Sequence, residues 1–487
     1  MLSRLSGCLA LLALAGCPSN PQQDASSDDA SDIAQPDVMV DDIPRDTGPP
    51  RPPWPHTLPM ASTLGEFRGF HTARTIIHSH SVHSHDACDG NPYVDGGVNE
   101  PCLQDFRRAI CAAHIDVNFL TEHAGLMADG PFERVMQMRA GDEPIMDGSD
   151  LVGYRINCDD GHRSLVFPGA ENELMPLALR HHPDLVNGSL NDAYHADDAA
   201  GVARFRAAGA IVAIAHTEQR TLDQLNALGP DLIEIYNSHA NLDPRIAMPY
   251  LGLDVGPIFA DILRFAATGN NLEPDMVFIA FFRESQNDLG KWASLWANGT
   301  NMPGIAGSDT HENTIAALLS DGERGDSYRR LWRSYNNFVR VENSIDRTNM
   351  LDALVHGRSY VVLEAFGSPD GFDTYADDGA GTIAEMGGSL AMGPNVNIHV
   401  TAPTIYHLDP SLPSASIRIR VLRADAAMGW LEVASTMDPT LTFHPTQPGA
   451  YRVEIRITPT HLTPYVPRLE RILVENPWIY ANPIRVM

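Results

Sequence analysis

Five short apolar runs in this chain each stop at a histidine or a carboxylate, and this pattern constrains the fold more than any other feature. In an extended strand, residues two apart point the same way, so the first two histidines can face one point. Segments that predict helices, such as 105–113 and 197–209, separate the runs. Strands that alternate with helices predict a parallel α/β barrel with polar groups at the C-terminal strand ends. The residues at the five ends are His78 and His80, His123, Glu171, His216, and Asp309 with His311.

Ionisable groups at every strand end have the chemistry of a metal site. For any single histidine, a hydrogen-bonded surface position is the commoner explanation, but folding alone does not require such a group at all five ends. Imidazole and carboxylate ligands suit zinc, manganese or iron. Glu234 lies inside the apolar run 231–237 and faces either the pocket or an arginine, because a buried carboxylate is costly unless it is paired.

The five motifs, IIHSHS, FLTEH, PGAE, IAH and GSDTH in this order, resemble those of the polymerase and histidinol phosphatase (PHP) family of metal-dependent hydrolases. The resemblance spans residues 75–363. The segment LDALVHGRSYVV at 351–362 is similar to the carbaryl-hydrolase-like branch of that family. The resemblance implies the α/β class, with a distorted (β/α)7 barrel over residues 61–367 that holds two or three divalent metal ions (Zn, Mn or Fe).

The resemblance also implies a ligand set. By position, Glu171 bridges two metals, and the other matched residues ligate single ions or close the cluster: His78, His80, His123, His216, Asp309 and His311. The family places a further histidine shortly after the bridging glutamate, and His181 and His182 both stand there.

The first motif departs from the family pattern. The usual Ser-Asp-Gly is replaced by Ser84-His85-Asp86, and Asp89-Gly90 follows an insertion. We therefore expect Asp86 to be the further metal ligand, with His85 second and Asp89 as a remaining alternative.

The reaction expected of such a cluster is hydrolysis. A water that bridges two divalent ions loses a proton near neutral pH and becomes the nucleophile, while the ions neutralise charge on the substrate. Asp309 is expected to orient or deprotonate that water, and His311 or a neighbouring histidine to protonate the leaving group. No GxSxG elbow surrounds a serine, which disfavours an acyl-enzyme route.

The resemblance to this family favours a small-molecule phosphate ester as the substrate. The branch resembled here also includes enzymes that cleave carbamate esters, so an ester, carbamate or amide hydrolase is the second hypothesis. A phosphate pocket needs cations, and Lys291 is the only lysine in the chain. Three arginines lie in predicted loops, each with a surface position as its alternative: Arg163, Arg220 and Arg324. A third hypothesis is a metal-binding lipoprotein without catalysis.

The N-terminus has the features of an export signal. Arg4 precedes an apolar run at 9–15 that is too short to span a bilayer, and small residues lead to Cys17. This end resembles a bacterial lipobox, which implies a signal segment at 1–17 and a lipid on Cys17 that holds the protein to a membrane outside the cytoplasm. An ordinary secretory signal is the alternative. Residues 18–60 predict a disordered, acidic, Pro-rich linker.

The formal net charge of -28 argues against nucleic acid and anionic lipid as partners, because like charges repel. Membrane contact is therefore expected only through the lipid, and the oligomeric state is left open. Four cysteines remain outside the signal and anchor, and an even number in an exported protein favours disulfides. Of the three possible pairings, we prefer Cys88 with Cys102 and Cys111 with Cys158.

The C-terminal part, residues 368–487, changes to an alternating pattern. Val396, Ile398 and Val400 lie two apart, as do residues around 417–421 and 451–457. This alternation predicts a small all-β sandwich-like domain. It would either pack on the barrel as part of one enzyme or serve as a carbohydrate- or wall-binding module, although no row of aromatic residues favours the latter.

Overall fold

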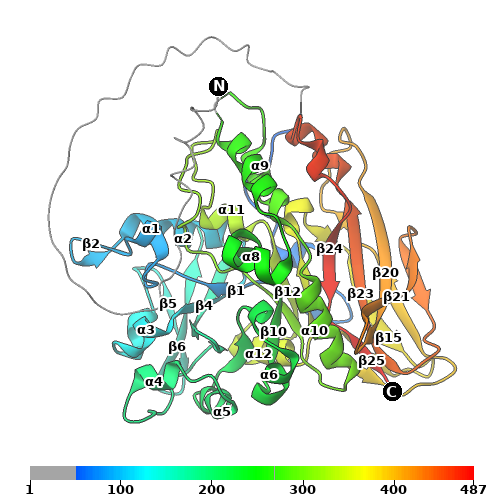
Figure 1. Ribbon diagram of the computed structural model, residues 1–487, viewed down its shortest axis with the longest axis horizontal. Helices are drawn as coiled ribbons and strands as arrows, with labels where there is room; N and C mark the ends of the chain where they lie inside the picture. Colours follow the sequence, from blue (N-terminus) through cyan, green and yellow to red (C-terminus); the bar gives the residue numbers. More distant parts are fainter. Residues whose placement is uncertain (1–50, 268) are drawn as a thin grey trace.

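A computed structural model describes residues 51–267 and 269–487. The predicted signal segment, the predicted lipidation site Cys17 and most of the predicted linker lie outside the described residues. Within them, no helix is both long and apolar enough to cross a membrane. The chain forms a mixed α/β structure with one large mixed sheet, several smaller sheets and helices between the strands (Figure 1).

The large sheet has 13 strands and contains both early and late parts of the chain. Its N-terminal half has the order β12-β1-β4-β7-β6-β5, in which β4 pairs in parallel with both β1 and β7. Nearly every residue of β4 is buried, as expected for a strand covered on both faces. These strands are β1 (Phe70–Ser79), β4 (Val117–His123), β5 (Glu143–Asp147), β6 (Asp150–Asn157), β7 (Arg163–Glu171) and β12 (Asn336–Glu342).

A four-stranded sheet with the order β11-β10-β9-β8 lies beside this half. The two sheets meet where Ser308 N donates to Ile77 O at 2.8 Å and where Leu179 N donates to Pro168 O at 2.8 Å. Their ladders remain separate, so the described strands form two sheets in place of one hydrogen-bonded ring. The four strands are β8 (Met175–Leu177), β9 (Ile211–Ile214), β10 (Leu232–Asn237) and β11 (Gly304–Gly307).

Helices connect the strands, and the predicted helices at 105–113 and 197–209 are largely present as α2 and α5. The Asn99 side chain accepts from Cys102 N and caps α2, which buries Phe106 and Ile110. The longer helices are α2 (Glu100–Ala112), α5 (Ala199–Ala207), α6 (Leu222–Leu228), α8 (Pro244–Leu251), α9 (Gly256–Ala266), α10 (Gln286–Ala297) and α12 (Arg347–Val355). Shorter helical segments are α1 (Ala87–Gly90), α3 (Ala124–Ala128), α4 (Leu190–Tyr194), α7 (Ser238–Leu242), α11 (Tyr328–Trp332), η2 (Ala61–Thr63), η3 (Phe132–Val135), η4 (Thr217–Gln219), η5 (Pro274–Phe281), η6 (Glu364–Phe366), η7 (Thr460–Tyr465) and η8 (Glu470–Ile472).

The C-terminal strands continue the large sheet, so this part of the chain packs directly on the N-terminal half. β13 (Ser359–Val362) pairs with β24 (Asn476–Ala481), and Val361 lies opposite Tyr480. Both strands are fully buried, so the pairing joins the two halves through their cores. In Figure 1, β23 and β24 lie at the right of the molecule, and the N-terminal strands lie to their left. The remaining strands of this half are β17 (Ser389–Leu390), β20 (Ser416–Asp425), β21 (Gly429–Thr436), β23 (Gly449–Thr458) and β25 (Ile484–Val486).

A second C-terminal sheet explains the alternating pattern seen around Val396. Ile398 and Val400 are buried in its strand β18, and they share one hydrophobic core with Ile419 and Val421 of β20. The two layers therefore give a sandwich-like arrangement at this end. Its strands are β15 (Asp373–Asp377), β16 (Ile383–Ala384), β18 (Asn397–Thr401) and β22 (Thr440–Phe443). Two short pairs complete the described strands: β14 (Pro369–Asp370) with β19 (Thr404–Ile405), and β2 (Tyr93–Val94) with β3 (Gly97–Val98).

Residues 51–60 pack against the body, although their composition assigned them to the linker. Trp54 Nε1 donates to Asp275 Oδ2 at 2.9 Å, and Leu58 is buried with its backbone N–H bonded to Ala112 O. One tryptophan and one leucine supply the apolar surface that a linker lacks.

The preferred disulfide pairing is confirmed: Cys88 is bonded to Cys102, and Cys111 to Cys158.

Candidate metal centre

The strand ends deliver their ligands with an unusual backbone geometry. His78, His216 and Asp309 have φ values of 61°, 52° and 51°. A positive φ is uncommon outside glycine and costs energy that the surrounding structure must supply. Each of the three residues ends or follows a buried strand and turns its side chain toward the other two. We interpret this shared distortion as a requirement of the site.

Glu171, at the end of β7, lies at the centre of the cluster. Its Oε1 is 3.5 Å from His78 Nε2 and 3.3 Å from His216 Nε2. Its Oε2 is 2.8 Å from His123 Nδ1 and 3.6 Å from His80 Nε2. One carboxylate therefore faces four imidazoles from three other strand ends, which is the position that a bridging ligand requires.

Asp309 faces Glu171 across the cluster. Its Oδ1 lies 3.4 Å from His78 Nε2 and 3.5 Å from both His80 Nε2 and His311 Nδ1. Its Oδ2 is 3.6 Å from His216 Nε2. The predicted ligands of all five motifs therefore meet in one place.

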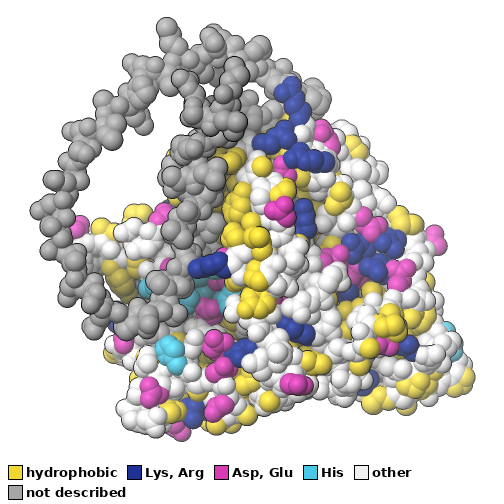
Figure 2. Space-filling view, in the orientation of Figure 1, with side chains coloured by type: hydrophobic (Ala, Val, Ile, Leu, Met, Phe, Trp, Pro, Cys, Tyr) yellow, Lys and Arg dark blue, Asp and Glu magenta, His cyan; other side chains and the backbone are white. Residues whose placement is uncertain are grey.

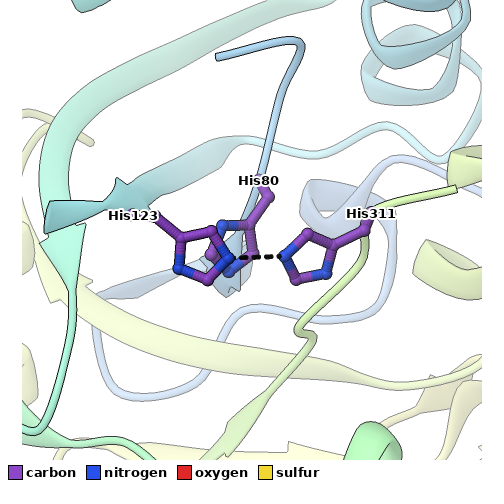
Figure 3. A group of neighbouring side chains, drawn as sticks. All are labelled: His80, His123 and His311. Carbon is purple, nitrogen blue, oxygen red and sulfur yellow. Dashed lines mark hydrogen bonds between the residues drawn. The ribbon is translucent and has the colours of Figure 1, made fainter. Parts of the chain in front are cut away.

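Three histidines from three motifs converge on one side of the cluster. His123 Nε2 and His311 Nε2 are 3.3 Å apart, as the dashed line in Figure 3 marks. The rings of His80 and His311 stack with centroids 3.8 Å apart. Nitrogens of the three rings all lie within 4.8 Å of one another. Lone pairs facing each other at this range are a suitable environment for a cation.

The first motif adds a further group through its altered sequence. Asp86 Oδ1 is 3.2 Å from His123 Nε2 and 3.4 Å from His311 Nε2. His85 is exposed, and its ring centroid is 4.9 Å from that of His123. His85, Asp86 and His123 together form one of the groups that could hold an ion. Asp89, the third alternative, instead forms an ion pair with Arg324.

A second layer of residues fixes the rings of the ligands. Glu234 Oε1 lies 2.6 Å from His78 Nδ1, so Glu234 faces the site and not an arginine. Ser84 Oγ is 2.7 Å from His80 Nδ1 and donates to Glu122 at 2.8 Å. Holding Nδ1 in this way points Nε2 inward and sets the tautomer, as outer partners of metal-bound histidines do.

The inward-facing nitrogens fit a metal. His78 Nε2 and His80 Nε2 are buried and have no hydrogen-bond partner among the described residues. A buried polar atom without a partner is costly, and a cation would satisfy both. Four groups of the cluster could hold an ion: His80, His123 and His311; His78, His80 and Glu171; His78, His216 and Asp309; and His85, Asp86 and His123. Figure 2 shows histidine and acidic side chains exposed together on the face drawn.

The carboxylates of the cluster govern its protonation. Burial opposes protonation of His78, but Asp309, Glu234 and Glu171 outweigh it and raise its pKa to about 10. Burial likewise opposes protonation of His123, but Glu171 and Asp86 raise its pKa to about 11. A group of carboxylates that attracts protons this strongly also attracts metal cations.

The two stacked histidines, His80 and His311, have lowered pKa values. Burial lowers the pKa of His80, and the neighbouring His311 lowers it further. Burial also lowers the pKa of His311. The pKa of Glu171 lies well below its ordinary value, because His123 and His78 outweigh the effect of burial. The two imidazoles are therefore neutral and the carboxylate is ionised at neutral pH, as ligands must be.

The structure does not bring His181 or His182 into the cluster, which corrects that part of the predicted ligand set. His182 Nδ1 lies 2.9 Å from Tyr194 Oη, and its Nε2 lies 3.0 Å from Gly130 O. His181 is exposed, and its Nδ1 is 2.7 Å from the His182 carbonyl. Both rings belong to the loop after β8, where local contacts hold them.

His239 is a site residue that the sequence analysis missed. It lies in α7, directly after β10, and its Nδ1 is 2.9 Å from Asp309 Oδ2. Burial opposes its protonation, but Asp309 and Asp243 raise its pKa to about 9. The run 231–237 ends at Asn237 and is followed by Ser238 and His239, so a histidine after an apolar run, the signal used at the other strand ends, was present in the sequence.

The protein was compared with family models, curated proteins and solved structures, and none matched.

Proposed function

We propose that this protein is a divalent-metal-dependent hydrolase of the PHP type that cleaves phosphate esters. The observation that carries the proposal is the convergence of seven predicted ligands, from five separate motifs, around Glu171 and Asp309. The distorted seven-stranded barrel of that family belongs to the proposal. It is supported by the parallel pairs β1/β4, β4/β7, β9/β10 and β10/β11, whose C-terminal ends supply ligands.

Two or three divalent ions, Zn, Mn or Fe, would occupy the groups described above. Such ions act as Lewis acids and lower the pKa of a bound water toward neutrality. Asp309 would orient the attacking water, since its two oxygens reach opposite sides of the cluster. His311 remains the first candidate for protonating the leaving group. His239 is the second, because its side chain is 35% exposed and touches Asp309.

The charge around the site bears on the choice of substrate. The three arginines considered from the sequence are engaged by acids: Arg163 with Glu143, Arg220 with Glu173 and Asp197, and Arg324 with Asp89 and Asp326. The metal ions would therefore have to neutralise the charge of a phosphate. This observation favours a carbamate, ester or amide hydrolase as the second candidate function, because its substrates carry less charge.

We further propose that the protein is exported and anchored through Cys17 to a bacterial membrane, on the periplasmic or cell-surface side. The two disulfides support an oxidising compartment, where such bonds persist.

Metal analysis and a substrate panel test the proposed function. Protein purified without added metal should contain zinc, manganese or iron and should cleave p-nitrophenyl phosphate or other phosphate esters. Turnover of 1-naphthyl carbamate alone would support the second candidate. Asp309→Asn should abolish turnover. Bound metal with no turnover of any substrate in the parent protein would favour the third hypothesis, a metal-binding lipoprotein without catalysis.

A further inference from the structure

Lys291 holds the turn that carries His216. Its Nζ donates to Thr217 O at 2.7 Å and to Glu218 O at 3.1 Å. It also lies 3.5 Å from Asp288 Oδ1, and its side chain is only 12% exposed. The ammonium group reaches these carbonyls from α10, which packs against η4. All of its polar contacts belong to this turn or to its own helix.

The turn that Lys291 contacts lies directly after His216. His216 has φ 52°, and η4 begins at the next residue. Glu218, within η4, places Oε1 3.3 Å from His216 Nδ1, so that Nε2 points at Glu171. Loss of the Lys291 bonds would therefore loosen the turn directly after His216 and the Glu218 carboxylate beside its ring. Two other contacts of this region would remain, those of Asn287 Nδ2 with Glu218 O and of His216 N with Glu234.

A lysine suits this position better than an arginine. Its ammonium is a compact charge with three donors, which matches two carbonyls and one carboxylate converging from different directions. An arginine presents a planar fork that matches two parallel acceptors. The chain has arginine at every other basic position and lysine only here.

We propose that Lys291 is a positioning residue for the metal centre, acting through the Thr217 and Glu218 carbonyls to fix the His216 ligand. This inference rests on the proposed function for its metal readout, while the local order of the turn can be measured without any metal. Lys291 does not touch the cluster, so it acts only through the turn.

Hydrogen exchange of the metal-free chain tests the proposal directly. Lys291→Met removes the charge and keeps most of the side-chain volume. Loss of a charged hydrogen bond should speed exchange of the amides at 216–220 roughly tenfold or more. Two of these amides, Gln219 and Arg220, now bond within the turn. Lys291→Arg should give an intermediate rate, because the charge remains while the donor geometry changes.

The matched control is Arg347, which also donates to two backbone carbonyls, those of Ala178 and Gly209, at the other end of β9. Arg347→Met should leave exchange at 216–220 unchanged. In the metal-loaded proteins, Lys291→Met should weaken binding of an ion by about 10–100-fold, measured by competition with a chelator, and Arg347→Met should not.

The outcomes separate this inference from the proposed function. If Lys291→Met exchanges faster at 216–220 but the unsubstituted protein binds no metal, the role of Lys291 in the turn is supported and the metal centre is overturned. A parent that binds metal, together with a Lys291→Met variant whose exchange and affinity match the control, would overturn the role of Lys291 alone. A uniform rise in exchange across the chain would also overturn it, because it indicates general destabilisation.

Discussion

His78 Nδ1 lies 2.6 Å from Glu234 Oε1, and this buried contact joins β1 of the large sheet to β10 of the smaller one. The other oxygen of Glu234 accepts from the His216 backbone N–H at 2.9 Å, so one carboxylate orders two candidate ligands. Gly307 makes room for it, since a Cβ there would lie 1.8 Å from Glu234 Oε1. The contact explains why a carboxylate stands inside an apolar strand.

Replacing Glu234 should therefore weaken metal binding without removing a ligand. Glu234→Gln keeps the shape but loses the charge that favours the inward-facing tautomer of His78. We expect a loss of about 10–100-fold in affinity for a divalent ion, as for other outer partners of metal ligands. Titration against a fluorescent chelator measures it. Glu143→Gln is the control, because Glu143 is a partly exposed carboxylate in β5 outside the groups that could hold an ion. Equal affinity in the two variants would contradict the role assigned to Glu234.

Replacing His239 should lower turnover, whereas replacing His181 should not. His239→Asn removes the imidazole that touches Asp309, and we expect turnover to fall by about 10²–10⁴-fold if the group transfers a proton. His181→Asn should leave kcat within a factor of about two, because that ring is exposed and outside the cluster. Steady-state kinetics at several pH values provides the comparison. A normal rate in His239→Asn would restrict proton transfer to His311.

The metal-free chain should be most stable near pH 6.5. The pKa values of His78, His123 and His239 are raised to about 10, 11 and 9, so their stabilisation is complete below pH 6.5 and is lost as pH rises through those values. His80 and His311 have lowered pKa values and must be neutral in the fold, which costs stability as pH falls below 6.5.

Thermal unfolding in the presence of a chelator, from pH 5 to pH 10, checks this dependence. With a divalent ion added, the high-pH loss should disappear, because deprotonated ligands bind metal more tightly. A midpoint that does not change with pH in the chelated protein would contradict the assigned protonation states.

The two disulfides should have separable effects. The Cys88–Cys102 disulfide begins two residues after Asp86, and Cys88 N donates to His311 O, whereas Cys111 and Cys158 lie outside the groups that could hold an ion. Serine at both positions of the first pair should remove an ion from the Asp86 group, measured as metal stoichiometry. Serine at both positions of the second should leave stoichiometry unchanged.

Loss of the second disulfide, Cys111–Cys158, should lower the free energy of unfolding more than loss of the first. The sequence separations are 14 and 47 residues, for which loop entropy predicts losses of about 3 and about 4 kcal/mol. Chemical denaturation measures both. Equal metal content in the two double variants would show that the Cys88–Cys102 loop does not support the site.

Much of the site was readable from the sequence because each ligand follows a short buried strand. The apolar runs and the turn residues after them mark where each strand ends. The strand period does not set the directions of His78 and His80, because His78 has φ 61° and His80 follows the last residue of β1. His181 and His182 were predicted from where the resembled family places a histidine, and such a resemblance does not show that the His182 ring contacts Tyr194 and Gly130. His239 was overlooked although its strand had been identified.

The sequence by itself determined the strands, the type of ligand at their ends and the disulfide-forming cysteines, since these depend on residue type and local period. Only the tertiary structure decided that Glu171 faces four imidazoles, that Glu234 orders His78, and that β24 continues the sheet beyond β13. These relationships join residues far apart in the chain, and their geometry follows from how the sheets pack, which local patterns do not encode.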